Sequence, residues 1–355
     1  MNSHDIQKLT SEAVQLLREM IAIPSPSFSE DEVCTYISNW MSQRDIPHTR
    51  TGNNIIAEHI SNPDLPTLML CAHIDTVAPC EGYSFNPYRP ENCPSDMVQG
   101  LGSNDDGASV VSMLAAYRYL TQQEAEKNIM LVLTCEEERS GINGMTGLWP
   151  QIKDKVDFAI VGEPTGMRAA TAERGLLVID ATAHGVSGHA ARNEGVNAIH
   201  IALEDIERLR RHQFSRISPR MGKVNLNVTQ INAGSAHNVI PDTCTFVIDI
   251  RPTEQYTNEE IFEELKSICT SELKPRNLRN RSSATFEDSP IQHTAEGLGI
   301  ETFSSPTTSD WMRISCDAVK IGPGDSSRSH RKDEFVFIKE IEDGIETYIE
   351  FINNL

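Results

Sequence analysis

Histidines and acids stand where apolar runs of the chain end. They are His73 and Asp75 after TLMLCA, Glu136, Glu137 and Glu138 after IMLVLTC, and Glu163 after VDFAIVG. Taken singly, an H-x-D pair fits a structural histidine bonded to an aspartate, and three successive acids fit a solvated turn. Buried strands of an open α/β sheet, however, deliver the residues that follow them to one edge of the sheet. We therefore expect these side chains to lie close together.

A glycine-rich loop, GLGSNDDG (100–107), adds the adjacent acids Asp105 and Asp106. A helix N-cap explains one acid, but two neighbouring carboxylates repel each other and indicate a nearby cation. The loop faintly resembles a phosphate-binding loop, yet it lacks the lysine which that motif requires. Near the end of the sequence, the polar segment SHRKDE (329–334) contributes His330.

Together these residues predict a metal site. Imidazole and carboxylate ligands without a thiolate fit a catalytic, open zinc-type site rather than a closed structural one. Five ligands with one shared carboxylate suit two ions about 3.5–4 Å apart, a spacing used for hydrolysis. The sequence therefore predicts a two-metal hydrolase with the ligands His73, Asp105, Glu138, Glu163 and His330.

The elements that must position this site change in character along the chain. Up to about residue 174, nearly continuous apolar runs (67–75, 129–135 and 156–162) alternate with helix-like segments, which is typical of a parallel or mixed α/β sheet. Beyond that point, alternating strands and helical segments at 195–213 and 257–273 indicate an α+β unit. We predict an α/β catalytic domain in two pieces (1–174 and 290–355), with a mixed, mainly parallel sheet flanked by helices. An inserted α+β domain with an antiparallel sheet (175–289) interrupts it.

Composition narrows the class of protein. At 355 residues the chain is long enough for two domains. A formal net charge of −20 argues against nucleic acid as a partner, because phosphate binding needs clustered lysine and arginine. We see no signal peptide, and no apolar run approaches the ~20 residues that span a bilayer. The eight cysteines are scattered without a CxxC pair, as expected of reduced thiols in a cytoplasmic protein.

An ordered set of motifs then resembles a known family, over nearly the full length. It is the co-catalytic zinc family that contains acetylornithine deacetylase, succinyl-diaminopimelate desuccinylase, aminoacylase and related peptidases. The motifs are AHIDTV (72–77), GLGSNDDGAS (100–109), TCEEERSGINGM (134–145), VGEPTG (161–166), GVSGHAARNEGVNAI (185–199), NVIPD (238–242), DIRP (249–252), TSD (308–310) and SHRKDE (329–334).

The resemblance implies a role for each site residue. His73 and Glu163 would hold one Zn²⁺, and Glu138 and His330 the other, with Co²⁺ or Mn²⁺ as possible substitutes. Asp105 would bridge the two ions, across a cis bond to Asp106. Asp75 would orient His73 from behind, and Glu137 would be the general base.

The resemblance also assigns residues outside the metal cage. His189, which the sequence alone would class as a loop histidine, would stabilise the oxyanion. Arg174, Asn238, Arg251 and Thr308 match positions that hold polar groups of the substrate, and an arginine suits a carboxylate. The inserted domain would form a homodimer, as it does in many family members.

The implied activity is hydrolysis of the amide bond of a small N-acyl amino acid, with N-acetylornithine or N-succinylornithine in arginine biosynthesis as the first expectation. A metallo-aminopeptidase, a dipeptidase or a succinyl-diaminopimelate desuccinylase is the alternative within the family. A non-catalytic metal-binding relative is disfavoured because Glu137 and every ligand are present, and a serine hydrolase because G-x-S-x-G is absent. The sequence departs from the family pattern at Asp106-Gly107-Ala108, at Asn193 and at Trp311-Met312-Arg313, so acyl specificity does not transfer.

Overall fold

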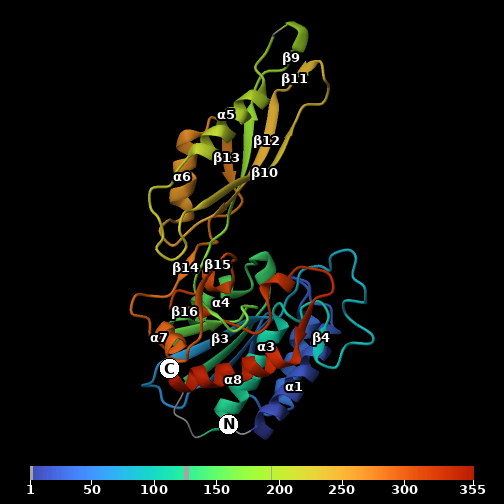
Figure 1. The fold of residues 1–355 in the computed structure, drawn as a ribbon, viewed down its shortest axis with the longest axis vertical. Coiled ribbons are helices and arrows are strands. Elements are labelled where there is room, and N and C mark those ends of the chain that lie inside the picture. Colours follow the sequence, from blue (N-terminus) through green and yellow to red (C-terminus); the bar gives the residue numbers. More distant parts are fainter. Residues whose placement is uncertain (1–2, 124–127, 193) are drawn as a thin grey trace. The chain divides into compact units, whose positions relative to one another are not determined.

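The computed structural model describes residues 3–123, 128–192 and 194–355, so Asn193 lies outside the described residues. The chain divides into two compact units, both drawn in Figure 1. Unit 1 comprises Met1–Thr171, Thr285–Phe303 and Ser309–Leu355, and unit 2 comprises Ala172–Ala284 and Ser304–Thr308.

Unit 1 is built on a mixed sheet with a parallel centre. Its strands are β1 (Thr49–Thr51), β2 (Asn54–His59), β3 (Thr67–His73), β5 (Asn128–Thr134), β6 (Phe158–Val161), β7 (Ala169–Glu173), β15 (Thr302–Ser305) and β16 (Asp317–Lys320). The order runs β1-β2-β5-β3-β6-β16-β7. β3 pairs in parallel with β5 and β6, and β16 pairs in parallel with β6, whereas β1–β2 and β2–β5 are antiparallel. The predicted mainly parallel α/β sheet is confirmed.

Helices cover both faces of this sheet. They are α1 (Ser3–Ile21), α2 (Asp31–Ser42), α3 (Gly107–Thr121), α4 (Met145–Ile152), α7 (Pro290–Gly297) and α8 (Ile338–Asn354). Leu68 and Leu70 of β3 pack in the cluster formed with α1, α3 and α8, whereas Met69 and Cys71 pack in a second cluster with α4. Every residue of β3 and β5 is buried, which explains their continuous apolar sequences.

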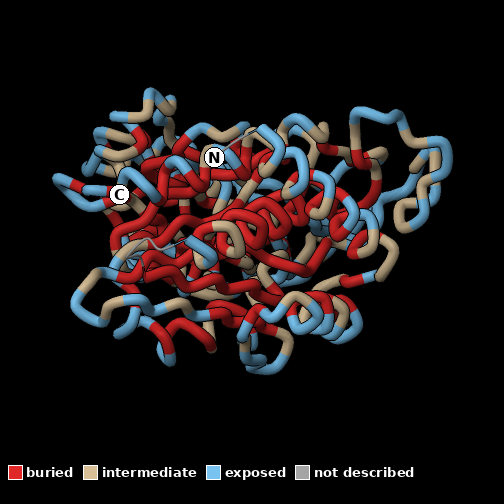
Figure 2. Tube along the Cα trace, turned by 90° about the horizontal axis from the view of Figure 1, so that it is seen from below, coloured by how far each residue is buried: buried red, intermediate tan, exposed pale blue. Residues whose placement is uncertain are grey.

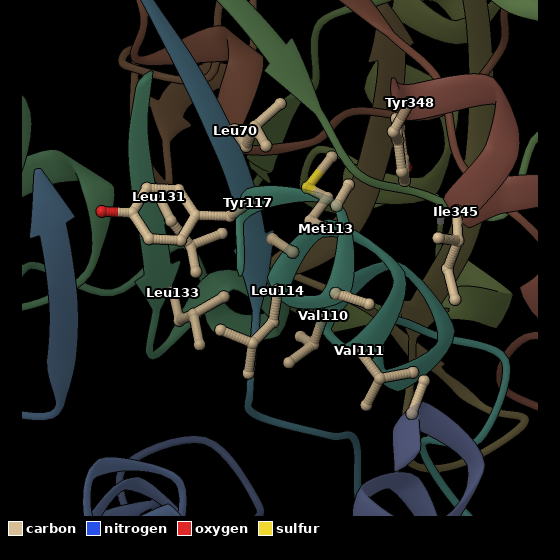
Figure 3. Packing of buried hydrophobic residues seen from close by; sticks show 14 of the residues in the cluster. Leu70, Val110, Val111, Met113, Leu114, Tyr117, Leu131, Leu133, Ile345 and Tyr348 are labelled. Atoms are coloured by element: carbon tan, nitrogen blue, oxygen red, sulfur yellow. The ribbon is translucent and has the colours of Figure 1, made fainter. Parts of the chain in front are cut away.

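Helix α3 lies at the centre of unit 1. Figure 3 shows its Val110, Met113 and Leu114 packed beside Leu70 and Leu133 of the sheet. Buried residues make up most of α3, and Figure 2 shows buried segments gathered in the interior with exposed loops around them. A helix that is apolar all round needs partners on every side, so α3 is a rigid support for the loop that enters it.

Unit 2 is an antiparallel sheet with helices on one face. Its elements are β8 (Leu177–His184), β9 (Gly188–His189), α5 (Ala198–Arg211), β10 (Asn225–Ala233), β11 (Val239–Ile240), β12 (Thr243–Arg251), α6 (Asn258–Ile268), β13 (Glu272–Pro275) and β14 (Ser283–Ala284). The four-stranded order is β10-β12-β8-β13, with antiparallel pairs throughout. Buried and less buried residues alternate along β8, and α5 and α6 share its apolar cluster. The predicted antiparallel α+β unit is confirmed.

One predicted element has other limits in the structure. The helical segment expected at 257–273 ends at Ile268 and gives way to β13. There the amides of Thr270 and Ser271 donate to the buried carboxylate of Asp205, at 2.9 and 2.7 Å, which draws the chain out of the helix. No helix in the described residues is long and apolar enough to cross a membrane.

Candidate metal centre

The carboxyl ends of β3, β5 and β6 bring the predicted residues together at one edge of the sheet. His73 is the last residue of β3 and pairs with Thr134, the last residue of β5. The turn Glu137–Arg139 begins three residues beyond β5, and Glu163 lies two residues beyond β6. This convergence follows from the parallel register, as ligand sites of open α/β sheets require.

Asp105 stands between two histidines. Its Oδ1 lies 3.2 Å from His73 Nε2, and its Oδ2 lies 3.6 Å from His330 Nε2. His330 Nε2 also lies 2.9 Å from Glu138 Oε1. Potential ligand atoms of His73, Asp105 and Glu138 lie within 4.8 Å of one another. A carboxylate with one oxygen toward each histidine is the arrangement that a bridging ligand needs.

A second group of ligand atoms shares His73. Atoms of His73, Glu137 and Glu163 also lie within 4.8 Å of one another. Each of the six predicted ligand and base residues therefore belongs to one of these groups or, in the case of His330, bonds directly to a member. Glu137 is as close to the histidine as a ligand would be, so position alone does not separate a base from a ligand.

Asp75 fixes both the histidine and the acidic turn. His73 Nδ1 lies 3.0 Å from the carbonyl oxygen of Asp75 and 3.4 Å from its Oδ1. The amides of Glu137 and Glu138 donate to the two oxygens of Asp75, at 3.0 and 3.1 Å. Ser27 Oγ donates to Oδ2 at 2.7 Å. One buried carboxylate thus orients His73 and positions the turn that carries two of the acids.

The loop of Asp105 is held by Glu334, which the sequence analysis did not single out. The carboxylate of Glu334 is buried and accepts hydrogen bonds from the amides of Gly102, Asn104 and Asp105, at 3.1, 2.9 and 3.0 Å. The peptide bond between Asp105 and Asp106 is cis, as the family resemblance implied. Glu334 ends the SHRKDE motif, so its place in that motif was the available signal.

The segment that carries His330 is joined to the same loop. Asn104 Nδ2 donates to the carbonyl oxygen of Asp325 at 3.1 Å and lies 3.2 Å from Ser329 Oγ, and the Asp325 amide donates to Asn104 Oδ1 at 2.9 Å. The strand β17 (Phe335–Phe337), which follows the His330 segment, pairs with β4 (Met97–Gln99), which precedes the Asp105 loop. Residues more than 200 positions apart in sequence are therefore held at one site.

The charges at this site are incompletely balanced. Burial raises the pKa of Glu137 and of Glu163 well above the usual range, and neighbouring acids add to the effect. Burial likewise raises the pKa of Asp106 to about 8. Several carboxyls compete for few cationic partners, and divalent ions would resolve this excess of negative charge. The donor set and its charge therefore fit metal ions.

Carboxylates of this site raise the pKa of both histidines. The hydrogen bond to Glu138 raises the pKa of His330 to about 9. Burial alone would lower the pKa of His73, but hydrogen bonds to Asp105 and Asp75 outweigh it and raise that pKa well above the usual value. Both imidazoles are thus surrounded by carboxylates. A bound cation would take the place of the imidazole protons as the partner of these carboxylates.

Asp310 and Trp311 lie behind the site. Asp310 is buried and accepts a hydrogen bond of 2.7 Å from Thr134 Oγ1, and burial raises its pKa to about 6. Trp311 is 1% exposed and packs in the apolar cluster of α4. The departure from the family pattern at Trp311 is therefore accommodated in the core of unit 1.

The remaining predicted residues belong to unit 2. Arg174 donates to the carbonyl oxygens of Lys223 and Arg251, at 3.0 and 3.1 Å, and to that of Met221. Arg251 forms a salt bridge with Asp249, with contacts of 2.9 and 3.2 Å.

Three further predicted residues occupy other parts of unit 2. His189 and Asn238 are exposed near the β9–β11 pair, where the Ala190 amide donates to the Asn238 carbonyl at 3.1 Å. Thr308 ends the short segment Ser304–Thr308. Within unit 2, contacts therefore join Arg174 to Arg251, and the neighbourhood of His189 to Asn238.

Comparisons with known proteins give a consistent result. Residues 171–277 match the family described as the peptidase dimerisation domain, and residues 54–167 match peptidase family M28. The chain is 26% identical to acetylornithine deacetylase from Proteus mirabilis, over 96% of each chain. It is 25% identical to succinyl-diaminopimelate desuccinylase from Corynebacterium glutamicum, over 94% of each chain.

Solved structures share the fold. A tripeptidase from Staphylococcus aureus superposes with a TM-score of 0.79 at 21% identity, over 97% of each chain. A dinuclear metal-binding peptidase of the M20 family from Bacillus subtilis superposes with a TM-score of 0.74 at 16% identity, over 98% of each chain.

Proposed function

Because the chain belongs to the M20 metallopeptidase family, we propose that it hydrolyses the amide bond of an N-acyl amino acid. The first substrates to test are N-acetylornithine and N-succinylornithine, in a step of arginine biosynthesis. One observation carries the proposal: the six acids and histidines predicted as ligands and base meet at one edge of the sheet. Relatives named acetylornithine deacetylase and succinyl-diaminopimelate desuccinylase, similar over almost their full lengths, support it.

The proposed cofactor is a pair of Zn²⁺ ions. His73 and Glu163 would hold one ion, Glu138 and His330 the other, and Asp105 both. Two such ions would polarise the substrate carbonyl and lower the pKa of the attacking water. The position of Asp105 between two histidines supports its bridging role.

The proposed base is Glu137. It would take a proton from the attacking water and pass it to the nitrogen of the leaving amine. Its amide is tethered to Asp75, so the side chain is presented from a fixed turn. Asp75 would hold the orientation of His73 during the reaction.

Unit 2 would complete the site. His189 would stabilise negative charge on the carbonyl oxygen, and Arg174, Asn238, Arg251 and Thr308 would bind polar groups of the substrate. Arg174 and Arg251 already have partners within unit 2, so substrate binding by either guanidinium would add to or replace these contacts.

We also propose a homodimer formed through residues 175–289, in the cytoplasm. The match to a peptidase dimerisation domain supports the dimer, as do exposed apolar side chains of unit 2 such as Leu203, Ile217 and Ile231. The cytoplasmic assignment is supported by the eight cysteines, all of which are free thiols.

A substrate panel tests the function. Metal-loaded enzyme is incubated with N-acetyl and N-succinyl derivatives of ornithine, N-succinyl-diaminopimelate and a set of dipeptides, and released amine is measured. We expect hydrolysis of at least one N-acyl amino acid with a higher kcat/KM than any dipeptide. Cleavage of dipeptides alone would contradict the deacylase proposal and leave the family's peptidase chemistry.

A further inference from the structure

Phe28 has a conformation that does not suit its side chain. Its φ is 75°, in the left-handed region where a side chain is disfavoured and glycine is the usual residue. Its side chain is nevertheless large, and the residue is 61% exposed. Neither backbone preference nor burial in the core accounts for phenylalanine here. Strained residues of this kind concentrate at binding and catalytic sites.

Hydrogen bonds fix the backbone on both sides of Phe28. The Ser27 amide donates to the Thr76 carbonyl at 3.2 Å, and the Thr76 amide donates to the Ser25 carbonyl at 2.9 Å. The Phe28 amide donates to Glu30 Oε1 at 2.8 Å. The ring is therefore presented from a rigid loop.

The same loop is bonded to the acidic turn of the metal centre. Glu30 Oε1 accepts a second hydrogen bond of 3.1 Å from the Glu136 amide, the residue before Glu137. Ser27 Oγ donates to the same Asp75 oxygen that accepts the Glu138 amide, at 2.7 and 3.1 Å. Ser27, which precedes Phe28, thus bonds to Asp75, and Glu30, two residues after Phe28, bonds to the Glu136 amide. Phe28 therefore belongs to a loop that is bonded to the turn of the proposed base, and its apolar side chain is exposed.

We propose that Phe28 is a specificity-determining residue, whose ring binds an apolar group of the substrate next to the scissile amide. This inference rests on the proposed function and adds a substrate class to it: N-acyl amino acids whose side chain is aliphatic near the α-carbon. Binding removes apolar surface of the ring and of the substrate side chain from water. A longer aliphatic side chain buries more of this surface and is therefore favoured.

The test uses Phe28→Gly with N-acetylglycine, N-acetylnorleucine and N-acetylornithine. Norleucine carries a methyl group where ornithine carries its terminal ammonium, so the pair separates apolar contact from charge. We expect the variant to lower kcat/KM for N-acetylnorleucine by roughly tenfold, mainly through KM. The value for N-acetylglycine should change less than about twofold, because it lacks the group that the ring binds. Phe28→Leu should retain most of the norleucine preference.

A stability measurement excludes a merely structural role. Glycine adopts a φ of 75° freely, so Phe28→Gly should keep or raise the melting temperature. Phe286→Gly is the matched control, because Phe286 is also exposed, at 52%, and its amide bonds to Asp317 at the start of β16, the opposite end of the strands. It should leave the substrate preference unchanged.

The outcomes separate the two proposals. A wild-type enzyme that hydrolyses none of the three derivatives and none of their N-succinyl counterparts overturns both this inference and the proposed function. Two outcomes overturn this inference alone, provided that the wild type hydrolyses the derivatives. In the first, Phe28→Gly lowers kcat/KM equally for N-acetylglycine and N-acetylnorleucine; in the second, it lowers neither. A lower melting temperature with a uniform loss would likewise assign Phe28 a structural role.

Discussion

Removal of the Glu334 carboxylate should loosen the loop that carries Asp105. This carboxylate accepts three backbone amides at 2.9–3.1 Å in a buried setting. Hydrogen bonds to a charged group contribute about 1.5–3 kcal/mol each, and unpaired buried amides are costly. Allowing for water that enters the space, Glu334→Ala should lower the free energy of unfolding by about 4 kcal/mol. At roughly 2–4 °C per kcal/mol, the melting temperature should fall by about 8–16 °C.

Two variants calibrate this magnitude. Glu334→Gln keeps an acceptor at Oε1 for the amides of Asn104 and Asp105 and loses the bond from Gly102, so about 1–2 kcal/mol should be lost. Asp333→Ala removes an exposed carboxylate that accepts the single amide of Ser84, at a cost of about 1 kcal/mol or less.

The assay is thermal unfolding of metal-loaded enzyme, followed by titration with zinc against a chelator. Because Asp105 lies in the loosened loop, zinc affinity of Glu334→Gln should fall about 10–100-fold. Melting temperatures that fall in the order wild type, Asp333→Ala, Glu334→Gln, Glu334→Ala would support the reasoning. A Glu334→Ala enzyme with wild-type melting temperature and zinc affinity would refute it.

Three further predictions follow from the charges and contacts described above. Chelated enzyme should lose stability as pH rises from about 4 through the raised pKa of Asp106 at about 8, because a carboxyl whose pKa is raised on folding stabilises the fold only while protonated. The difference in melting temperature between metal-loaded and chelated enzyme should then be larger at pH 8 than at pH 5. Equal differences at the two pH values would contradict this. His330→Ala should reduce zinc content toward one per chain with under about 1 kcal/mol lost, because the imidazole is 54% exposed; unchanged zinc content would exclude His330 as a ligand. Arg174→Ala should lower the melting temperature, because three carbonyl oxygens of unit 2 lose their donor. A higher KM with an unchanged melting temperature would instead favour a substrate role.

Much of the fold and the convergence of the candidate ligands at one sheet edge could be predicted because both rest on local signals. The buried strands β3, β5 and β6 are continuous apolar runs in sequence. His73 is the last residue of β3, and Glu137, Glu138 and Glu163 lie shortly after β5 and β6. The parallel pairing then fixes which ends meet.

Other features depend on contacts between distant residues. Glu334 and Asp310 form hydrogen bonds to segments far away in sequence, at Gly102–Asp105 and Thr134. Their motifs mark both residues, but the local sequence does not show which segments they contact. The end of α6 likewise depends on Asp205, more than 60 positions earlier. Trp311, which the sequence marked as unusual, is a core residue because packing against α4 decides its place.

Three adjacent acids offer the most direct test of the proposed mechanism. Glu136 is buried and its carboxylate bonds to the amide and side chain of Asn143, at 3.0 and 2.7 Å. Glu138 contacts His330, whereas Glu137 lies among ligand atoms yet is assigned as the base. The expected roles are therefore support of the turn for Glu136, metal ligand for Glu138 and general base for Glu137.

The decisive measurement is zinc content together with kcat for Glu136→Ala, Glu137→Ala and Glu138→Ala. We expect Glu137→Ala to retain about two zinc ions per chain while kcat falls by about 10²–10⁴-fold. Glu138→Ala should lose zinc, and Glu136→Ala should lose stability with zinc retained at low temperature. Near-wild-type turnover of Glu137→Ala, or loss of its zinc, would contradict the assignment of Glu137 as the base of a two-metal amide hydrolase.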